Sequence, residues 1–200
     1  MDLSPSAKDL QLAFSAEEQA TVSRVLKTRR TINTFTGELP DEALLLDAFE
    51  HARWAPNHKL TEPWQFILIG EQTKPALIEH MHAVMTEEKG AEKADKKIEK
   101  LRAVPGYFAV TSKLSPDDSF REREDYAATC CAIQIAMTRL WSLGIASKWS
   151  TAKFTRHENL YKLLEVNPAK REIVGLFMYG YPDRYPRTKR QAPESVVKRV

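Results

Sequence analysis

The sequence predicts a single domain that combines helices with a few short, buried strands. Three apolar runs of strand length lie at residues 65–70, 107–111 and 172–180, and the last is apolar along almost its whole length, as a strand covered on both faces would be. Residues 121–143 form a predicted helix whose apolar side chains cover most of its circumference, which indicates a buried helix. A chain of 200 residues is long enough to bury these elements in one core.

The composition is that of a soluble globular protein, with 42% hydrophobic and 28% charged residues. A net charge of +3 is too small to imply a nucleic-acid partner. The sequence has no run of about 18 apolar residues and no basic-then-apolar signal pattern. Cys130 and Cys131 are neighbours that point apart on a helix, so no disulfide is expected between them, which is typical of a reducing compartment. We therefore expect a cytoplasmic protein without a membrane or nucleic-acid partner.

The N-terminal part begins with residues that have little periodicity. Residues 1–14 are expected to form a loose arm, and residues 15–200 the one domain. Ser15 followed by Glu18 makes the capping-box pattern that begins a helix. The apolar face of this helix is expected to consist of Val22, Val25 and Leu26.

This first helix ends in a basic, hydroxyl-rich stretch at residues 29–35. The guanidinium groups of Arg29 and Arg30 beside hydroxyl and amide side chains match the geometry of a phosphate group. A basic helix end that only complements the helix dipole would give the same pattern. Both interpretations stay open at this point.

The second helix is predicted to begin at Pro40 and Asp41, and a loop with two prolines follows it at residues 53–64. This loop holds Trp54 and His58, which are unusual in a simple connector, and loops on a rigid frame often carry function. The buried face of the helix is expected to consist of Ala43, Leu44, Leu45, Ala48, Phe49 and Ala52.

Residues 73–102 are predicted to be a charged, solvated helical segment that ends at Pro105-Gly106. His80 and His82 lie two residues apart and do not share a helix face, so they predict no metal site.

The buried helix at residues 121–143 ends at Gly144, and a short extended run with Trp149 follows. We interpret this stretch as a helix that delivers residues 145–151 to a site, although an ordinary core helix with an exit loop would look alike. Gly175, inside the last strand, indicates close approach by another backbone. The basic tail contains three prolines and is expected to run along a surface or a partner subunit.

Motifs for common chemistries are absent. None of the seven glycines forms a GxGxxG or P-loop motif, and the sequence has neither GxSxG nor HExxH. An enzyme without such groups can bind a cofactor that carries the chemistry.

Four stretches together resemble the nitroreductase family of FMN flavoproteins, in that family's order, over roughly residues 20–190. They are Arg-Arg-Thr-Ile-Asn-Thr-Phe at 29–35, Ala-Pro-Asn-His through Pro-Trp-Gln-Phe at 55–66, the turn at 144–151, and the strand with the Gly-x-Pro after it at 173–182. The resemblance implies an α+β fold, a mixed sheet surrounded by helices, in an intertwined homodimer with FMN at the interface. A partner subunit would explain why the 121–143 helix is apolar on nearly every side.

The resemblance also implies a set of cofactor-binding residues. Arg29, Arg30 and Thr31 would hold the FMN phosphate and ribityl chain, with Lys189 and Arg190 as late phosphate ligands. Arg187 is equally near in sequence, so the register of these late ligands stays open.

The remaining implied contacts lie along the flavin ring. Asn33 stands where the family often has a cation beside flavin N1 and O2, and Leu60 where many relatives have Asn. The ring would be lined by Trp149, Ser150 and Thr151, and contacted from the other subunit by His58 with Trp54.

The implied activity is an NAD(P)H-dependent oxidoreductase with ping-pong hydride transfer through FMN N5, and with no catalytic side chain. NADH or NADPH would be the donor, and a nitroaromatic, quinone or similar small molecule the acceptor. A flavin-binding sensor or carrier with little reductase activity is the first alternative, and a nucleic-acid module built on the basic tail is the second. The sequence selects neither the donor nor the acceptor, and gives no role to the charged residues 85–102.

Overall fold

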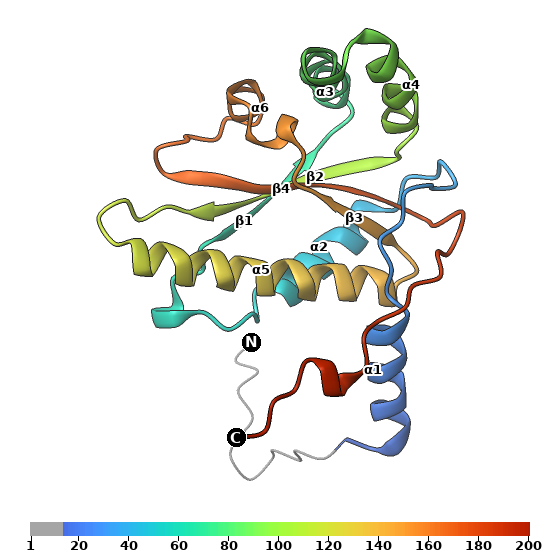
Figure 1. Ribbon diagram of the computed structural model, residues 1–200, viewed down its shortest axis with the longest axis vertical. Helices are drawn as coiled ribbons and strands as arrows, with labels where there is room; N and C mark the ends of the chain where they lie inside the picture. Colours follow the sequence, from blue (N-terminus) through green and yellow to red (C-terminus); the bar gives the residue numbers. More distant parts are fainter. Residues whose placement is uncertain (1–13) are drawn as a thin grey trace.

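Four strands form one antiparallel sheet in the order β1-β2-β4-β3, with helices on both of its faces (Figure 1). The computed structural model describes residues 14–200, so the predicted arm lies outside the described residues except for Phe14. The strands are β1 (Trp64–Ile69), β2 (Gly106–Lys113), β3 (Ala146–Ser150) and β4 (Arg171–Gly180). The helices are α1 (Ala16–Thr28), α2 (Glu42–Ala52), α3 (Lys74–Lys89), α4 (Ala91–Arg102), α5 (Ser119–Ser142) and α6 (Glu158–Leu163). Three short 3-10 helices are η1 (His58–Leu60), η2 (Lys153–Arg156) and η3 (Pro193–Ser195).

The three predicted strands are confirmed as β1, β2 and β4, and the run at 145–151 supplies β3 as a fourth. The central strands β2 and β4 are buried almost throughout, whereas β1 is only partly buried because it is an edge strand. All strand ladders are antiparallel, and parallel pairing in the described chain is limited to the bridge between Thr31 and Ser147.

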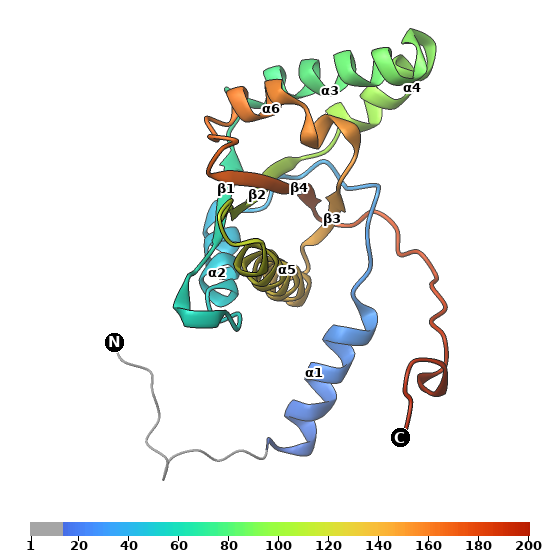
Figure 2. The ribbon, with the colours of Figure 1, turned by 60° about the vertical axis from the view of Figure 1, so that its left-hand side comes forward.

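The two faces of the sheet carry separate helix layers (Figures 1 and 2). Helices α2 and α5 cover one face, where Phe108, Phe177 and Leu140 are buried. Helices α3, α4 and α6 cover the other, where Leu77 and Met81 are buried. Because successive side chains of a strand point to opposite faces of the sheet, neighbouring residues of β3 face different helix layers.

The prediction of one solvated helical segment at residues 73–102 is wrong. The segment is two helices, separated at Gly90 with a φ of 82°, and each helix buries one face. Leu77 and Met81 on α3 and Ile98 on α4 lie in the core. The many charged residues hide an apolar stripe at helical spacing, which is enough to anchor each helix on the sheet.

Helix α1 begins as predicted, with the capping box of Ser15 and Glu18, but it buries none of its residues. Val22 and Leu26 are more than half exposed, so the expected buried face is open in the single chain. They line an apolar groove of about 390 Å³ between α1 and α5. On α2, Leu45, Ala48 and Ala52 are buried as predicted, whereas Ala43 is exposed.

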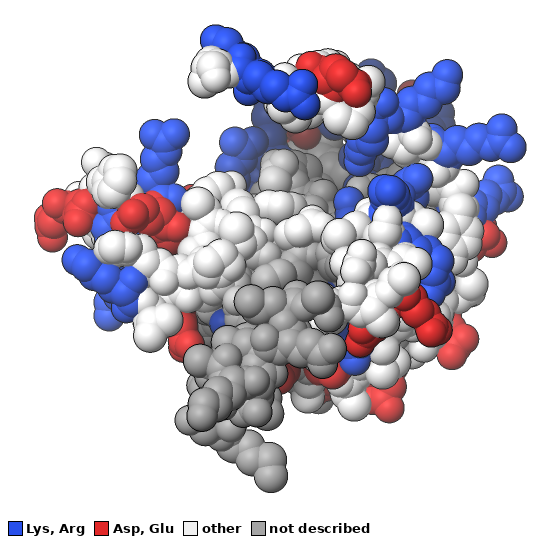
Figure 3. Space-filling view, turned by 90° about the horizontal axis from the view of Figure 1, so that it is seen from below, with Lys and Arg blue, Asp and Glu red and all other residues white. Residues whose placement is uncertain are grey.

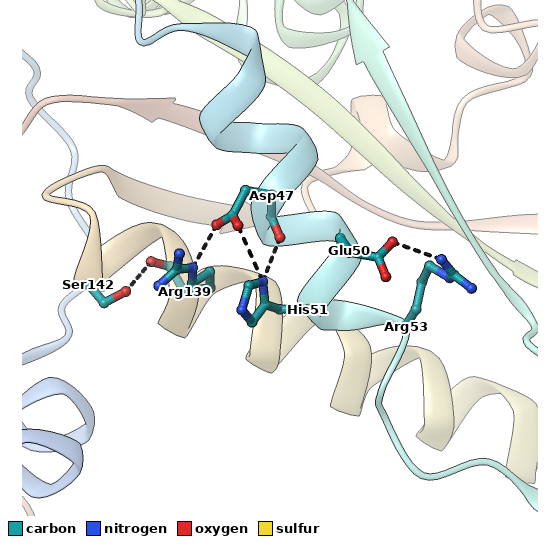
Figure 4. A network of polar contacts seen from close by, with 6 residues as sticks. All are labelled: Asp47, Glu50, His51, Arg53, Arg139 and Ser142. Atoms are coloured by element: carbon teal, nitrogen blue, oxygen red, sulfur yellow. Dashed lines mark hydrogen bonds and ion pairs between the residues drawn. The ribbon is translucent and has the colours of Figure 1, made fainter. Parts of the chain in front are cut away.

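Helix α5 is buried on the side that packs on the sheet and exposed on the other, where Tyr126 is 40% exposed. The single chain therefore does not bury this helix on every side, although its apolar sequence predicted such burial. Arg139 on α5 donates from Nε to Asp47 on α2 at 2.6 Å, and His51 lies beside this contact (Figure 4). Within residues 14–200, no helix combines the length and apolar character needed to cross a bilayer.

Candidate functional site

A cluster of guanidinium groups forms at the C-terminal end of α1. Arg29 caps the helix, and Nη1 of Arg30 donates to the carbonyls of Lys27 and Arg29 at 2.7 and 2.8 Å. These bonds fix Arg30 in place. Nη1 of Arg29 is different, because it is buried and has no hydrogen-bond partner among residues 14–200.

The C-terminal tail brings a third guanidinium to this cluster. Burial lowers the pKa of Arg29, and the nearby charges of Arg190 and then Arg30 lower it further. Arg190 is therefore the late basic residue whose charge acts on Arg29, although its side chain is exposed, like those of Lys189 and Arg187. A buried guanidinium donor without a bonded acceptor, with two further guanidinium groups near it, has the character of an anion site.

Thr31 connects this cluster to β3. The bridge between Thr31 and Ser147, with the Ile32 amide 3.5 Å from the Ser147 carbonyl, lays the segment after Arg30 beside the outer edge of β3. The side chains of Thr31 and Asn33 are exposed there. The bridge therefore brings together two of the stretches that carry the family resemblance, residues 29–35 and 144–151, and nothing in the sequence pattern specified it.

The outer edge of β3 is the second part of the site. This strand pairs with β4 on one side, and in the described chain its other side carries only the bridge at Ser147. The Ser147 carbonyl points to this outer edge, where it accepts from the Ile32 amide, so the backbone groups of Trp149, two residues on, lie at the same free edge and can bond a flat polar ligand. Thr151 follows directly and is exposed.

Trp149 is held on the α2/α5 side of the sheet. Its indole stacks on Phe177 with a centroid distance of 5.5 Å, and Nε1 donates to the Val174 carbonyl at 3.2 Å. A Cβ at Gly175 would lie 2.1 Å from this Nε1, so only glycine leaves room for the ring. Close approach at Gly175 was predicted for a backbone, but the nearest atoms belong to the indole, and the carbonyl of Ser150 is at 3.2 Å.

The loop at residues 54–62 lies away from these residues, at the other end of α5 (Figure 1). Trp54 is 69% exposed and His58 is also exposed, so neither contacts the Arg29 cluster within the chain. The 16 residues between Asp125, beside this loop, and Trp141, which donates to Thr28 on α1, span about 24 Å of helix. One chain thus carries two separate halves of the predicted site.

The loop conformation depends on two polar side chains. Asn57 donates to the Ala55 carbonyl at 3.1 Å and accepts from the Glu62 amide at 3.0 Å. Thr61 donates to Oδ1 of Asp125 at 2.6 Å, and Asp125 is only 2% exposed. Lys59, Leu60 and Glu62 all have positive φ angles, an unfavourable backbone that these bonds must hold.

Asp125 is the functional-site residue that the sequence interpretation missed. It follows Glu122 and Glu124 at the acidic start of α5, yet it lies on the buried side of the helix with Ala128, Thr129 and Ala132. Oδ2 of Asp125 is 3.6 Å from Nε of Arg121 and makes no hydrogen bond in the described chain. The spacing of three, four and seven residues to those neighbours is the signal that could have found it.

Comparisons with known proteins identify the family and the fold. A model of the nitroreductase family matches residues 26–181. The chain is 27% identical to "Putative NAD(P)H nitroreductase YfhC" of Bacillus subtilis, over 88% of this chain and 92% of that protein. Among solved structures, the nitroreductase-like family protein from Bacillus cereus has a TM-score of 0.81 at 27% identity, with 94% and 97% of the two chains covered. The FMN-dependent nitroreductase NfnB from Mycobacterium smegmatis, in complex with NADPH, has a TM-score of 0.73 at 18% identity, with 91% and 99% covered.

Proposed function

The chain belongs to the nitroreductase family, and we propose that it is an FMN-dependent NAD(P)H oxidoreductase that reduces a small acceptor such as a nitroaromatic or a quinone. The observation that carries this proposal is the buried Nη1 of Arg29, which has no hydrogen-bond partner in the described chain and lies near two further guanidinium groups. A buried donor without a partner is costly, and a phosphate group would satisfy it. The residues present therefore fit FMN.

Each part of the site has a role in this assignment. Arg29, Arg30 and Arg190 hold the phosphate, with Lys189 beside them, and Thr31 and Asn33 lie along the ribityl chain and the ring edge. The free edge of β3 from Trp149 to Thr151 bonds the ring through its backbone. Bound FMN would supply the redox chemistry, and the protein binds and orients it. No side-chain acid or base is needed.

The two separated halves of the site support a homodimer in which His58 and Trp54 of the partner subunit complete the pocket. The side of the molecule that carries α5 and α1 has a largely uncharged middle, with charged side chains gathered toward its margins (Figure 3). The apolar groove between these helices lies on the same side. A second copy that covers this face would bury the exposed sides of both helices.

We expect the purified protein to sediment as a dimer at micromolar concentration. Leu26→Glu should weaken this dimer, because it places a charge on the exposed apolar face of α1, whereas Lys27→Glu is the control on the neighbouring exposed position. A monomer that binds FMN fully would contradict the shared site. We place the protein in a reducing cytoplasm, which agrees with the free thiols of Cys130 and Cys131.

An absorbance spectrum before and after NAD(P)H under argon tests the activity. Bound oxidised flavin absorbs at about 370 and 450 nm, and we expect these bands to bleach on addition of the donor. Bands that persist would favour a flavin-binding sensor or carrier, in which the neutral Asn33 leaves the reduced ring without a nearby cation. Initial rates with donor and acceptor should give the parallel lines of a ping-pong reaction, because both use one pocket.

A further inference from the structure

Lys148 is a half-buried cation on β3, next to Trp149 at the border of the candidate site. Along β3, Trp149 faces the α2/α5 layer, so the preceding side chain faces the opposite layer, which contains α3 and α4. Its register partner Met178 belongs to the core cluster of that layer. Lys148 is half-buried, and its ammonium has no hydrogen bond or ion pair within the described part of the chain.

The neighbouring helix α4 has more basic side chains than acidic side chains that could pair with them. Its three acidic side chains are already paired: Glu92 with Lys96, Asp95 with His82, and Glu99 with Arg102. The remaining lysines are Lys93, Lys97 and Lys100, none of which has an ion pair with residues 14–200. Their spacing of four and three residues places them on one stripe of the helix, about 10 Å long.

Lys97 in this stripe lies near Lys148. The side chain of Lys148 faces the layer that contains α4, where its register partner Met178 shares a buried cluster with Ile98, the residue next to Lys97. Burial lowers the pKa of the Lys148 ammonium, and the nearby charge of Lys97 lowers it further. Two ammonium groups near each other, one of them half-buried, repel unless an anion lies between them. The arrangement is costly in the free protein and favourable once an anion is bound.

The position of Lys148 beside the proposed flavin pocket indicates which anion it binds. Lys148 follows Ser147, which bridges Thr31, and precedes Trp149 on the free strand edge, so it borders the proposed flavin pocket. The FMN phosphate already has the guanidinium groups of Arg29, Arg30 and Arg190. A second phosphate ligand at this pocket is the electron donor, which carries a diphosphate and, in NADPH, a further 2′-phosphate.

We propose that Lys148 and Lys97, extended by Lys93 and Lys100, bind the phosphate groups of the nicotinamide dinucleotide, and that they make NADPH the preferred donor. This inference rests on the proposed oxidoreductase function. The inference gives a role to the charged helix α4. The core face of α4 anchors the helix on the sheet, and the lysine stripe binds the donor.

The first experiment measures the KM for NADPH and for NADH in the wild type, Lys148→Met and Lys97→Ala. Each lost charge-assisted contact should raise the KM for NADPH by about 10-fold or more, with a smaller effect on NADH. Lys96→Ala is the matched control, because this lysine lies on the same helix but is paired with Glu92, and it should change neither KM. Equal KM values for the two donors in the wild type would overturn the preference for NADPH.

The second experiment needs no turnover. Adenosine 2′,5′-bisphosphate, titrated into the FMN-loaded wild type in a calorimeter, should bind with an affinity that falls with salt and that Lys148→Met reduces at least 10-fold. Unchanged binding in both lysine variants would refute the site. Loss of FMN from Lys148→Met would assign this lysine to the flavin instead and also overturn the proposal. If bound flavin fails to bleach with either donor, the oxidoreductase function fails, and the bisphosphate titration still decides whether the lysines bind phosphate.

Discussion

Arg29→Ala should yield a protein that is purified largely without FMN. The variant removes the buried guanidinium whose Nη1 has no acceptor within the described chain, and with it a charge-assisted contact to the phosphate. Such contacts contribute about 1.5–3 kcal/mol each, so the dissociation constant for FMN should rise by roughly 10- to 100-fold. Removal of one of three repelling cations should leave the apo-protein at least as stable as the wild type.

Fluorescence titration of free FMN into the apo-protein measures this effect. Arg24→Ala is the matched control, because Arg24 lies on the same helix and is exposed, so FMN binding should stay unchanged. Arg190→Ala should weaken binding in the same direction as Arg29→Ala, whereas Arg187→Ala should not, which settles the register of the late phosphate ligands. Full flavin occupancy in Arg29→Ala would show that the cluster does not hold the phosphate.

Asp125→Ala should cause the largest loss of stability of any polar substitution in the site. It removes a carboxylate that is 2% exposed, accepts a hydrogen bond from Thr61 and pairs with Arg121 at 3.6 Å. Loss of one partner from such a buried pair costs about 3 kcal/mol. For a chain of this length that corresponds to a melting temperature lower by roughly 10 °C.

Two further variants separate stability from positioning. Asp117→Ala removes an exposed carboxylate in the turn before α5 and should melt like the wild type. Thr61→Val removes only the hydrogen bond to Asp125, so it should cost less stability but still release the strained loop that carries His58. We expect Thr61→Val to weaken FMN binding by a few-fold. If Thr61→Val binds FMN like the wild type, the loop does not take part in the pocket.

Local sequence signals identified the elements that depend on nearby residues. The capping box at Ser15, the stop at Gly144 and the apolar run of β4 each act over a few residues, and the structure has all three. The Arg29 cluster could also be anticipated, because guanidinium side chains match a phosphate wherever the chain places them. The four motifs in order then identified the family.

Signals that depend on packing were misinterpreted. Residues 73–102 looked solvated because charged side chains outnumber the apolar stripe, although that stripe alone anchors α3 and α4 on the sheet. The hydrogen bond that Asp125 accepts could not be anticipated, because its donor Thr61 is distant in sequence. Val22 and Leu26 looked like a core face, yet within one chain they line the open groove between α1 and α5 and stay more than half exposed.

The sequence by itself determined the family, the strands of the sheet core and the cationic end of α1, since these follow from short-range pattern and residue chemistry. Only the tertiary structure decided that Arg190 lies near Arg29, that Lys148 lies near Lys97, and that the loop at residues 54–62 lies at the far end of α5. These contacts join residues that are tens of residues apart in the chain. Their geometry depends on strand order, register and helix packing, which one-dimensional patterns do not encode.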